Sequence, residues 1–390
     1  MTDERLSMKL RRPLIIVTLM LIVASLSGCD DAAETEPGLS TEETVLKAEY
    51  RPLPGDDWEV STPGEQGLDP ALIDEVYENA AELETLYSLL VIKDGFLIAE
   101  QYFNGGSVDE KTLIQSATKS YISALVGIAI EQGCLSSVDQ KMLAFFPEVA
   151  DEVTDPRKHE ITIRQLLQMR SGYPDEETDA ALLEALYWGV PTTLIEPFPL
   201  VSDPGADFNY SNLTYNWLAI ILERACGPDL RDFARGYLFE PTDSEVGEWL
   251  KDYEDNYIGS GGIHVTARDA ARFGLLYLRD GAHKGTQVVP ADWVHASLQT
   301  YSEGARDYGW GFALKDMGYG YGWWTARAGD HDFAFAWGHG GQLIVLLDEL
   351  DMVIVTTADP FFGQHDGESW KHEKANMNLV GTFIKSLPSK

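Results

Sequence analysis

Patterns typical of β-strands occur near both ends of this 390-residue chain, whereas its middle is mostly helical in pattern. On the N-terminal side, apolar runs at 87–93 and 96–103 flank Asp94-Gly95, a strong signal for a β-hairpin. On the C-terminal side, short apolar or aromatic segments separated by turns occupy 320–328, 332–339, 342–349 and 351–358. We therefore expect an α/β fold. One antiparallel sheet would be formed from both chain ends and flanked by helices, with a mostly helical region inserted between them.

The expected helices have start and stop residues. Asp69 and Pro70 supply an N-cap and a first helical residue for the helix that follows them. Thr266 and Asp269 form a capping pair for another helix, which Gly281 stops. Further helices are expected within the segments 161–169, 212–227 and 368–387.

The chain is strongly acidic except at its N-terminus. It contains 29 Lys and Arg against 63 Asp and Glu, so its net charge is −34 and a nucleic-acid partner is not expected. Residues 1–28 combine a basic start with the apolar run PLIIVTLMLIVASL, which predicts a secretory signal. The run is shorter than a membrane-spanning helix requires. The ending Leu-Ser-Gly-Cys resembles the processing box of bacterial lipoproteins, which implies lipidation of Cys29. The alternative is an ordinary signal peptide with a chance cysteine.

These features predict three parts. Residues 1–28 would be a lipoprotein signal peptide, and 29–60 an acidic flexible tether, because this segment is rich in acidic residues with Pro and Gly. Residues 61–388 would form the folded domain. A lipid anchor at Cys29 would attach the exported protein to a membrane of the bacterial cell envelope, on its periplasmic side. Cys134 and Cys226 are either buried thiols or, in an oxidising compartment, a disulfide.

The segment LIQSATKSYISALVGIAIEQG places a serine and a lysine at the start of an apolar helix. Ser116 and Lys119 are three residues apart and would share one helix face, with about 5–6 Å between their Cβ atoms. The helix dipole and the apolar surroundings both predict a lowered pKa for Lys119, and a neutral amine can take the serine proton. The backbone N–H of Ser116 could help bind an oxyanion. The alternative is that Ser116 only caps the helix while Lys119 extends to water.

Two further polar motifs follow. Tyr210-Ser211-Asn212 precedes an apolar helix, and His339-Gly340-Gly341 leads into a strand where glycines would let a substrate approach the backbone. The order Ser-x-x-Lys, Tyr-Ser-Asn, His-Gly-Gly resembles the serine hydrolases related to class C β-lactamases and penicillin-binding proteins. The resemblance extends over roughly residues 60–388. Within that family, the chain looks most like the branch of 6-aminohexanoate-dimer hydrolases and related esterases.

This resemblance implies a β-lactamase/transpeptidase-like fold and an acyl-enzyme mechanism. Ser116 would be the acylated nucleophile and Lys119 the general base. Tyr210 would relay protons to the leaving group and later to the deacylating water. Asn212 would orient Lys119 or a substrate amide.

The same resemblance assigns the His-Gly-Gly motif to substrate binding. His339 and Gly341 would line the site, and Gln342 would supply the second oxyanion N–H. His339 stands where β-lactamases usually have lysine. A fixed cation for the carboxylate of a β-lactam would then be missing at neutral pH, so β-lactams are the less expected substrates.

The leading hypothesis is an exported serine hydrolase that cleaves a small-molecule amide or ester. A D-Ala peptidase or β-lactamase acting on cell-wall peptides or their mimics is an alternative. A non-catalytic binding or sensor protein with the same fold is another. No Gly-x-Ser-x-Gly, Walker or His-Glu-x-x-His pattern occurs, so no cofactor or metal is expected, and no protein partner is implied.

Overall fold

The computed structural model describes residues 57–389 with the exception of 177–178, 189, 228, 306–312 and 364–367. The predicted signal peptide, Cys29 and most of the predicted tether lie outside the described residues, and the expected boundaries of these parts stay predictions. Among the helices that the structure describes, none is long and apolar enough to span a membrane.

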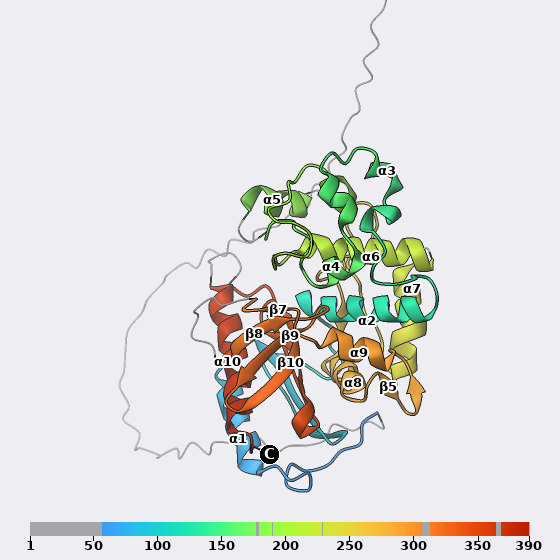
Figure 1. Ribbon diagram of the computed structural model, residues 1–390. Coiled ribbons are helices and arrows are strands. Elements are labelled where there is room, and N and C mark those ends of the chain that lie inside the picture. Colours follow the sequence, from blue (N-terminus) through green and yellow to red (C-terminus); the bar gives the residue numbers. More distant parts are fainter. Residues whose placement is uncertain are drawn as a thin grey trace, which may run out of the picture. The chain divides into compact units, whose positions relative to one another are not determined.

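An eight-stranded antiparallel sheet joins the two ends of the domain, as the strand patterns predicted (Figure 1). Its strand order is β2-β1-β12-β11-β10-β9-β8-β7. The N-terminal hairpin thus pairs through β1 directly with β12, the last strand in the sequence. The strands are β1 (Leu86–Lys93), β2 (Phe96–Tyr102), β7 (Ser302–Glu303), β8 (Lys315–Tyr319), β9 (Trp324–Ala328), β10 (His331–Gly338), β11 (Gln342–Leu347) and β12 (Met352–Ala358).

The hairpin turn forms as expected, because Asp94 and Gly95 both adopt positive φ, at +53° and +87°. β11 and β12 are buried along their whole length, as is typical of strands with both faces covered. Figure 1 shows α1 (Pro70–Ala81) and α10 (Ser369–Ser386) together on one side of the sheet, with α8 (Ala267–Leu278) on the other side.

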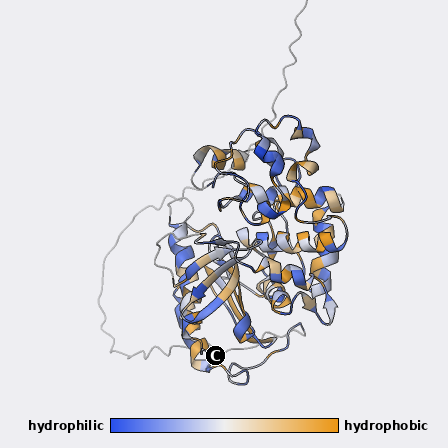
Figure 2. Ribbon diagram, in the orientation of Figure 1, coloured by the Kyte–Doolittle hydropathy of each residue, from blue (hydrophilic) through white to orange (hydrophobic). Residues whose placement is uncertain are grey.

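The inserted region is helical, and its centre is the pair α2 (Thr118–Glu131) and α6 (Asn212–Cys226), which pack against each other. Both helices are buried over most of their length, consistent with apolar residues on several faces (Figure 2). The other helices are α3 (Pro147–Ala150), α4 (Ile163–Leu167), α5 (Ala180–Trp188), α7 (Leu230–Ala234) and α9 (Ala291–Ser297). Short strands pair β3 (Thr112–Leu113) with β4 (His264–Val265), and β5 (Ala282–His283) with β6 (Thr286–Gln287).

The predicted caps are confirmed. Asp69 accepts a hydrogen bond from the backbone of Ala71 at the start of α1, and Thr266 accepts one from Asp269 at the start of α8. The helix expected to begin at Ser116 differs in its first turn. Residues 115–117 form a 3₁₀ turn, η1, and the α-helix proper begins at Thr118.

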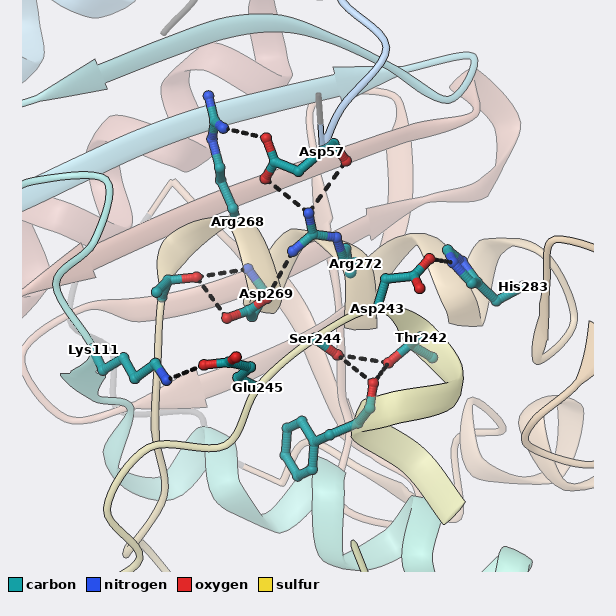
Figure 3. Close-up of polar contacts among 12 residues, drawn as sticks. Asp57, Lys111, Thr242, Asp243, Ser244, Glu245, Arg268, Asp269, Arg272 and His283 are labelled. Carbon is teal, nitrogen blue, oxygen red and sulfur yellow. Dashed lines mark hydrogen bonds and ion pairs between the residues drawn. The ribbon is translucent and has the colours of Figure 1, made fainter. Parts of the chain in front are cut away.

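Ion pairs attach the first described residues to α8 (Figure 3). The Asp57 carboxylate lies 2.6 Å from an Arg268 nitrogen and 2.8 Å from an Arg272 nitrogen. Arg268 also binds the buried carboxylate of Glu100 through two hydrogen bonds of 2.8 Å. The Arg272 guanidinium lies 5.5 Å from the centre of the Trp58 ring. This network attaches Asp57 and Trp58 to α8.

Cys134 and Cys226 are both thiols and partly exposed. They lie near the C-terminal ends of α2 and α6 respectively. Burial, followed by a hydrogen bond with Cys134, raises the pKa of the Cys226 thiol. The two cysteines are therefore neighbours, although no disulfide joins them in this structure.

Candidate active site

Ser116 and Lys119 meet at the start of α2, as their spacing predicted. Lys119 Nζ lies 2.9 Å from Ser116 Oγ, and it donates to Asn212 Oδ1 at 2.8 Å and to the Ser260 carbonyl at 2.7 Å. The lysine does not extend to water, because it is only 1% exposed. Neither η1 nor α2 has a side-chain cap. The geometry therefore rules out the alternative in which Ser116 caps the helix and Lys119 extends to solvent.

These hydrogen-bond partners of Lys119 fit an amine that exchanges a proton with Ser116. The oxygens of Asn212 and Ser260 can each accept one N–H. The remaining position on Nζ faces Ser116 Oγ, where an ammonium would donate a hydrogen bond and a neutral amine would accept one through its lone pair. The fixed pair of acceptors thus directs the lone pair of a neutral Lys119 toward the serine hydroxyl.

The backbone before Ser116 is strained. Gln115 has a φ of +47°, in the left-handed region that non-glycine residues enter at a cost of about 1–3 kcal/mol. The pairing of β3 with β4 precedes this turn, and the Ile114 N–H donates to the Ile263 carbonyl at 3.0 Å. Because Ser116 is in the first turn of η1, its backbone N–H has no intrahelical acceptor, which suits the predicted oxyanion role.

Tyr210 lies beside the lysine. Its ring centre is 4.9 Å from Lys119 Nζ, and the residue is only 7% exposed. Trp324 stacks on this ring at 5.6 Å, and Tyr319 meets it edge-on at 6.4 Å. The aromatic contacts hold Tyr210 near Lys119, which agrees with its predicted place in the site.

A Gly-rich loop supplies the Ser260 carbonyl, which sequence reasoning did not identify as part of the site. Asn216 is one turn after Asn212 in α6, and its Oδ1 accepts a hydrogen bond of 3.0 Å from the Ser260 N–H. A Cβ at Gly259 would lie 2.2 Å from the Tyr215 carbonyl oxygen, so only glycine fits this close approach to α6. The run Gly-Ser-Gly-Gly was the available signal, because clustered glycines often mark such an approach.

Glu176 is a second functional candidate that sequence reasoning missed. Its carboxylate accepts hydrogen bonds from the Ser211 hydroxyl at 2.7 Å, the Asn212 N–H at 2.7 Å and the Leu213 N–H at 2.9 Å. It thus occupies the N-terminus of α6, where backbone N–H groups and the helix dipole favour a negative charge. In sequence it belongs to the acidic run PDEETD, which looks like solvated surface.

The His-Gly-Gly turn connects β10 with β11 beside η1. A Cβ at Gly338 would lie 2.1 Å from the Ile114 carbonyl oxygen, so this strand end packs directly against the residues before Ser116. Gly340 and Gly341 have φ of +89° and +99°. A Cβ at Gly341 would also lie 2.5 Å from the Asn376 side chain of α10. Both glycines are therefore required by backbone conformation, and Gly341 by packing as well.

A buried carboxylate of α10 holds this turn. Glu373 Oε2 lies 2.5 Å from His339 Nδ1 and accepts from the Gly340 N–H at 3.1 Å. Its Oε1 accepts from the Trp337 indole at 2.7 Å. The Glu373 side chain is 2% exposed and that of His339 27% exposed. Because an ionised carboxylate only accepts hydrogen bonds, this contact fits the tautomer of His339 that bears a proton on Nδ1. This partner of His339 could not be foreseen from the motif.

The side chain of Gln342 points away from the predicted oxyanion position. It binds the backbone of Ala358 twice, donating to its carbonyl at 2.6 Å and accepting from its N–H at 3.0 Å. Only the backbone N–H of Gln342 remains for the role that the resemblance implies, and that role stays a prediction. Among the described residues, no cluster of His, Cys, Asp and Glu side chains could hold a metal ion.

A cavity of about 1160 Å³ lies away from this chemistry. Its lining includes residues from the start of β10, such as Asp332, whereas His339 follows the opposite end of that strand. Ser116, Tyr210, Asn212 and Ser260 are not among its lining residues. The reaction site is therefore assigned from the hydrogen bonds around Ser116 rather than from cavity size.

Comparisons with known proteins show the family and the fold of the chain. The sequence profile of the β-lactamase family matches residues 86–375, a range that contains Ser116, Tyr210, His339 and Glu373. The chain belongs to the β-lactamase family. It is 27% identical over 284 residues to 6-aminohexanoate-dimer hydrolase from Paenarthrobacter ureafaciens, which covers 69% of this chain and 71% of that protein. The family assignment and this relative identify the chain as a serine hydrolase.

Solved structures of related proteins have the same fold. The octameric penicillin-binding protein homologue from Pyrococcus abyssi superimposes with a TM-score of 0.57 at 18% identity, covering 79% of this chain and 78% of that one. A penicillin-binding protein homologue from Caulobacter crescentus gives 0.58 at 19% identity, covering 79% and 97%. The predicted β-lactamase/transpeptidase-like fold is confirmed.

Proposed function

We propose that this protein hydrolyses an amide or ester bond through an acyl-enzyme on Ser116, with Lys119 as general base and Tyr210 as proton relay. The observation that supports this most strongly is the set of contacts at Lys119 Nζ. Asn212 and Ser260 occupy two of its hydrogen-bonding directions, and the third meets Ser116 Oγ at 2.9 Å.

In the proposed reaction, Ser116 Oγ attacks the substrate carbonyl carbon while its proton passes to Lys119 Nζ. The backbone N–H of Ser116, together with that of Gln342, would stabilise the oxyanion of the tetrahedral intermediate. Tyr210 would pass a proton to the departing amine or alcohol, and the acyl-enzyme forms as that bond breaks. Water would then attack the ester on Ser116, with the proton transfers reversed.

For the substrate, we favour a linear amide or ester. The relative from Paenarthrobacter is named for a linear amide, and β-lactam recognition would need a cation at the position of His339. The pairing of His339 with Glu373 keeps a second candidate open, namely a D-Ala peptidase or β-lactamase. A carboxylate beside Nδ1 stabilises an imidazolium, which could bind the carboxylate of such substrates.

A substrate panel tests the proposal. Purified protein would be assayed with p-nitrophenyl esters, linear amides of aminohexanoate type, nitrocefin and D-Ala-D-Ala peptides. Labelling with a fluorophosphonate probe would be measured in parallel. Turnover of esters or linear amides with labelling is the expected result. Preference for nitrocefin or D-Ala peptides would select the second candidate, and absence of both labelling and turnover would favour a non-catalytic binding or sensor protein.

We also propose that the protein is an exported lipoprotein anchored through Cys29. The support is the basic and apolar character of residues 1–28 and the Leu-Ser-Gly-Cys box. The native protein should partition into detergent and begin at a diacylated Cys29, and Cys29→Ala should release it or block its processing. A native protein that stays in the aqueous phase with another N-terminus would contradict this localisation.

A further inference from the structure

Glu176 is a buried carboxylate that the reaction proposed above does not use. The residue is 1% exposed, although ionised carboxylates are costly to bury. Burial raises the pKa of Glu176, while its three hydrogen-bond donors and the charge of Lys119 oppose that shift. A merely structural cap on α6 would not require a charged group so deep in the domain, because Ser211 already caps this helix through the Thr214 N–H.

Glu176 is connected to the catalytic lysine through one residue. Its Oε2 accepts the Asn212 N–H at 2.7 Å, and the Asn212 side-chain oxygen accepts from Lys119 Nζ at 2.8 Å. Any movement of the carboxylate would therefore move the acceptor that orients Lys119. Glu176 also binds the Ser211 hydroxyl and so fixes the residue between Tyr210 and Asn212.

Lys119 is a charged side chain whose field lowers the pKa of Glu176. The titratable groups that face Lys119 from the segment around α6 are Tyr210 and Tyr215, whose ring centres lie 4.9 and 5.9 Å from Nζ. Burial raises the pKa of Tyr215, so this ring is neutral at ordinary pH. Asp175, the neighbour of Glu176 in sequence, is partly exposed and thus better screened by water.

We propose that Glu176 is a positioning residue of the Ser116–Lys119 site: a buried counter-charge that orients Lys119 through Asn212 and stabilises the proton that Lys119 takes from Ser116. This inference rests on the proposed function, because it assigns Glu176 a part in the same acylation step. When the serine proton reaches Nζ, a positive charge forms inside the protein. A negative charge already in place stabilises it without rearrangement.

The sign of the expected pH effect follows directly. Lys119 must be neutral to act as base, so acylation falls at low pH as Lys119 becomes protonated. An ionised Glu176 favours protonation of Lys119. It therefore raises the pH at which the acylation rate begins to fall, which is the acid limb of the pH–rate profile. Removing the charge should move the acid limb to lower pH and also lower the plateau rate, because the protonated lysine is less well stabilised after the transfer.

The experiment measures the acylation rate against pH, from the burst of p-nitrophenol released by a slowly deacylating p-nitrophenyl ester, for wild type, Glu176→Gln, Glu176→Asp and Glu100→Gln. We expect Glu176→Gln to move the acid limb down by about one pH unit and to lower the plateau by about tenfold to a hundredfold. Glu176→Asp keeps the charge, so it should keep the limb near the wild-type pH while its rate falls. Glu100→Gln removes a buried carboxylate that pairs with Arg268, and it should leave the limb in place.

The outcomes distinguish a failure of the proposed function from a failure of the role proposed for Glu176. If wild type does not acylate, the proposed function itself fails. If wild type acylates but Glu176→Gln lowers the rate equally at every pH, then Glu176 is only structural and the inference is wrong. Should Glu176→Gln not fold, Glu176→Asp decides. Glu176→Asp keeps the negative charge. If its acid limb nevertheless moves as far as expected for loss of that charge, Glu176 is not a counter-charge and the inference is wrong.

Discussion

Replacing Glu373 by glutamine should loosen the turn that faces Ser116. The Glu373 carboxylate accepts hydrogen bonds from His339, Gly340 and Trp337. Glutamine has nearly the same shape but only one acceptor oxygen. If that oxygen stays on the Trp337 indole, the new NH₂ group faces the Gly340 N–H and His339 Nδ1–H. Two of the three hydrogen bonds are then replaced by contacts in which one N–H donor faces another.

The size of the effect follows from burial. A hydrogen bond to a charged group contributes about 1.5–3 kcal/mol, and a buried donor without an acceptor costs about 1–3 kcal/mol. Gly340 is buried and cannot recover its bond from water. His339 is 27% exposed, so it can turn to solvent or change its tautomer. We therefore expect the free energy of unfolding to fall by about 2–4 kcal/mol, mostly from Gly340.

Urea unfolding followed by tryptophan fluorescence measures this loss. The burst from a slowly deacylating p-nitrophenyl ester measures acylation of Ser116 in the folded variant. Acylation should be slower than in wild type, because the turn packs against the residues before the serine. Glu368→Gln is a matched control in the same region, since Glu368 makes an exposed pair with Lys371 and should cost less than about 1 kcal/mol. The reasoning fails if Glu373→Gln is as stable as the control and acylates like wild type.

Three further outcomes are expected. Lys119→Arg should slow acylation at neutral pH by at least about 10²-fold, because a guanidinium stays protonated; a wild-type rate would remove Lys119 as the base. Asp57→Asn should weaken the contacts with the arginines of α8 and lower the free energy of unfolding. Urea titrations should show a larger loss at low salt than at high salt, because salt screens ion pairs. An equal loss of unfolding free energy at both salt concentrations would contradict ion pairing. Hydrogen bonds from Lys284 and then His283 lower the pKa of Asp243 from 3.8 to about 2. Its stabilisation is therefore present above pH 3.8 and is lost as pH falls through about 2. The difference in unfolding free energy between wild type and Asp243→Asn should stay under about 1 kcal/mol at pH 7, because the pair is exposed, and should vanish below about pH 2.

Local patterns in the sequence predicted the parts of the fold and site that depend on neighbouring residues. The Asp94-Gly95 turn, the Asp69 and Thr266 caps and the buried strands near the C-terminus follow from short-range preferences. The contact between Ser116 and Lys119 also follows from helical spacing alone. Pairing of both chain ends in one sheet was inferred because strand-like segments occur only there.

The remaining parts of the site depend on contacts between distant segments. Glu176 and Glu373 are two of many acidic residues in a chain of net charge −34, and no local feature separates them from solvated ones. Ser260 contributes a backbone carbonyl, which any residue possesses. The 3₁₀ turn at 115–117 begins at Gln115, whose positive φ is not revealed by propensity.

The most direct test of this account is the site of covalent modification. Wild-type protein and Ser116→Ala would be incubated with a slowly deacylating ester and examined by intact-protein and peptide mass spectrometry. Circular dichroism would verify that the variant is folded. The account predicts an acyl adduct on the peptide that contains Ser116, and no adduct or turnover with folded Ser116→Ala. An adduct on another residue, or a variant that still hydrolyses the ester, would contradict it.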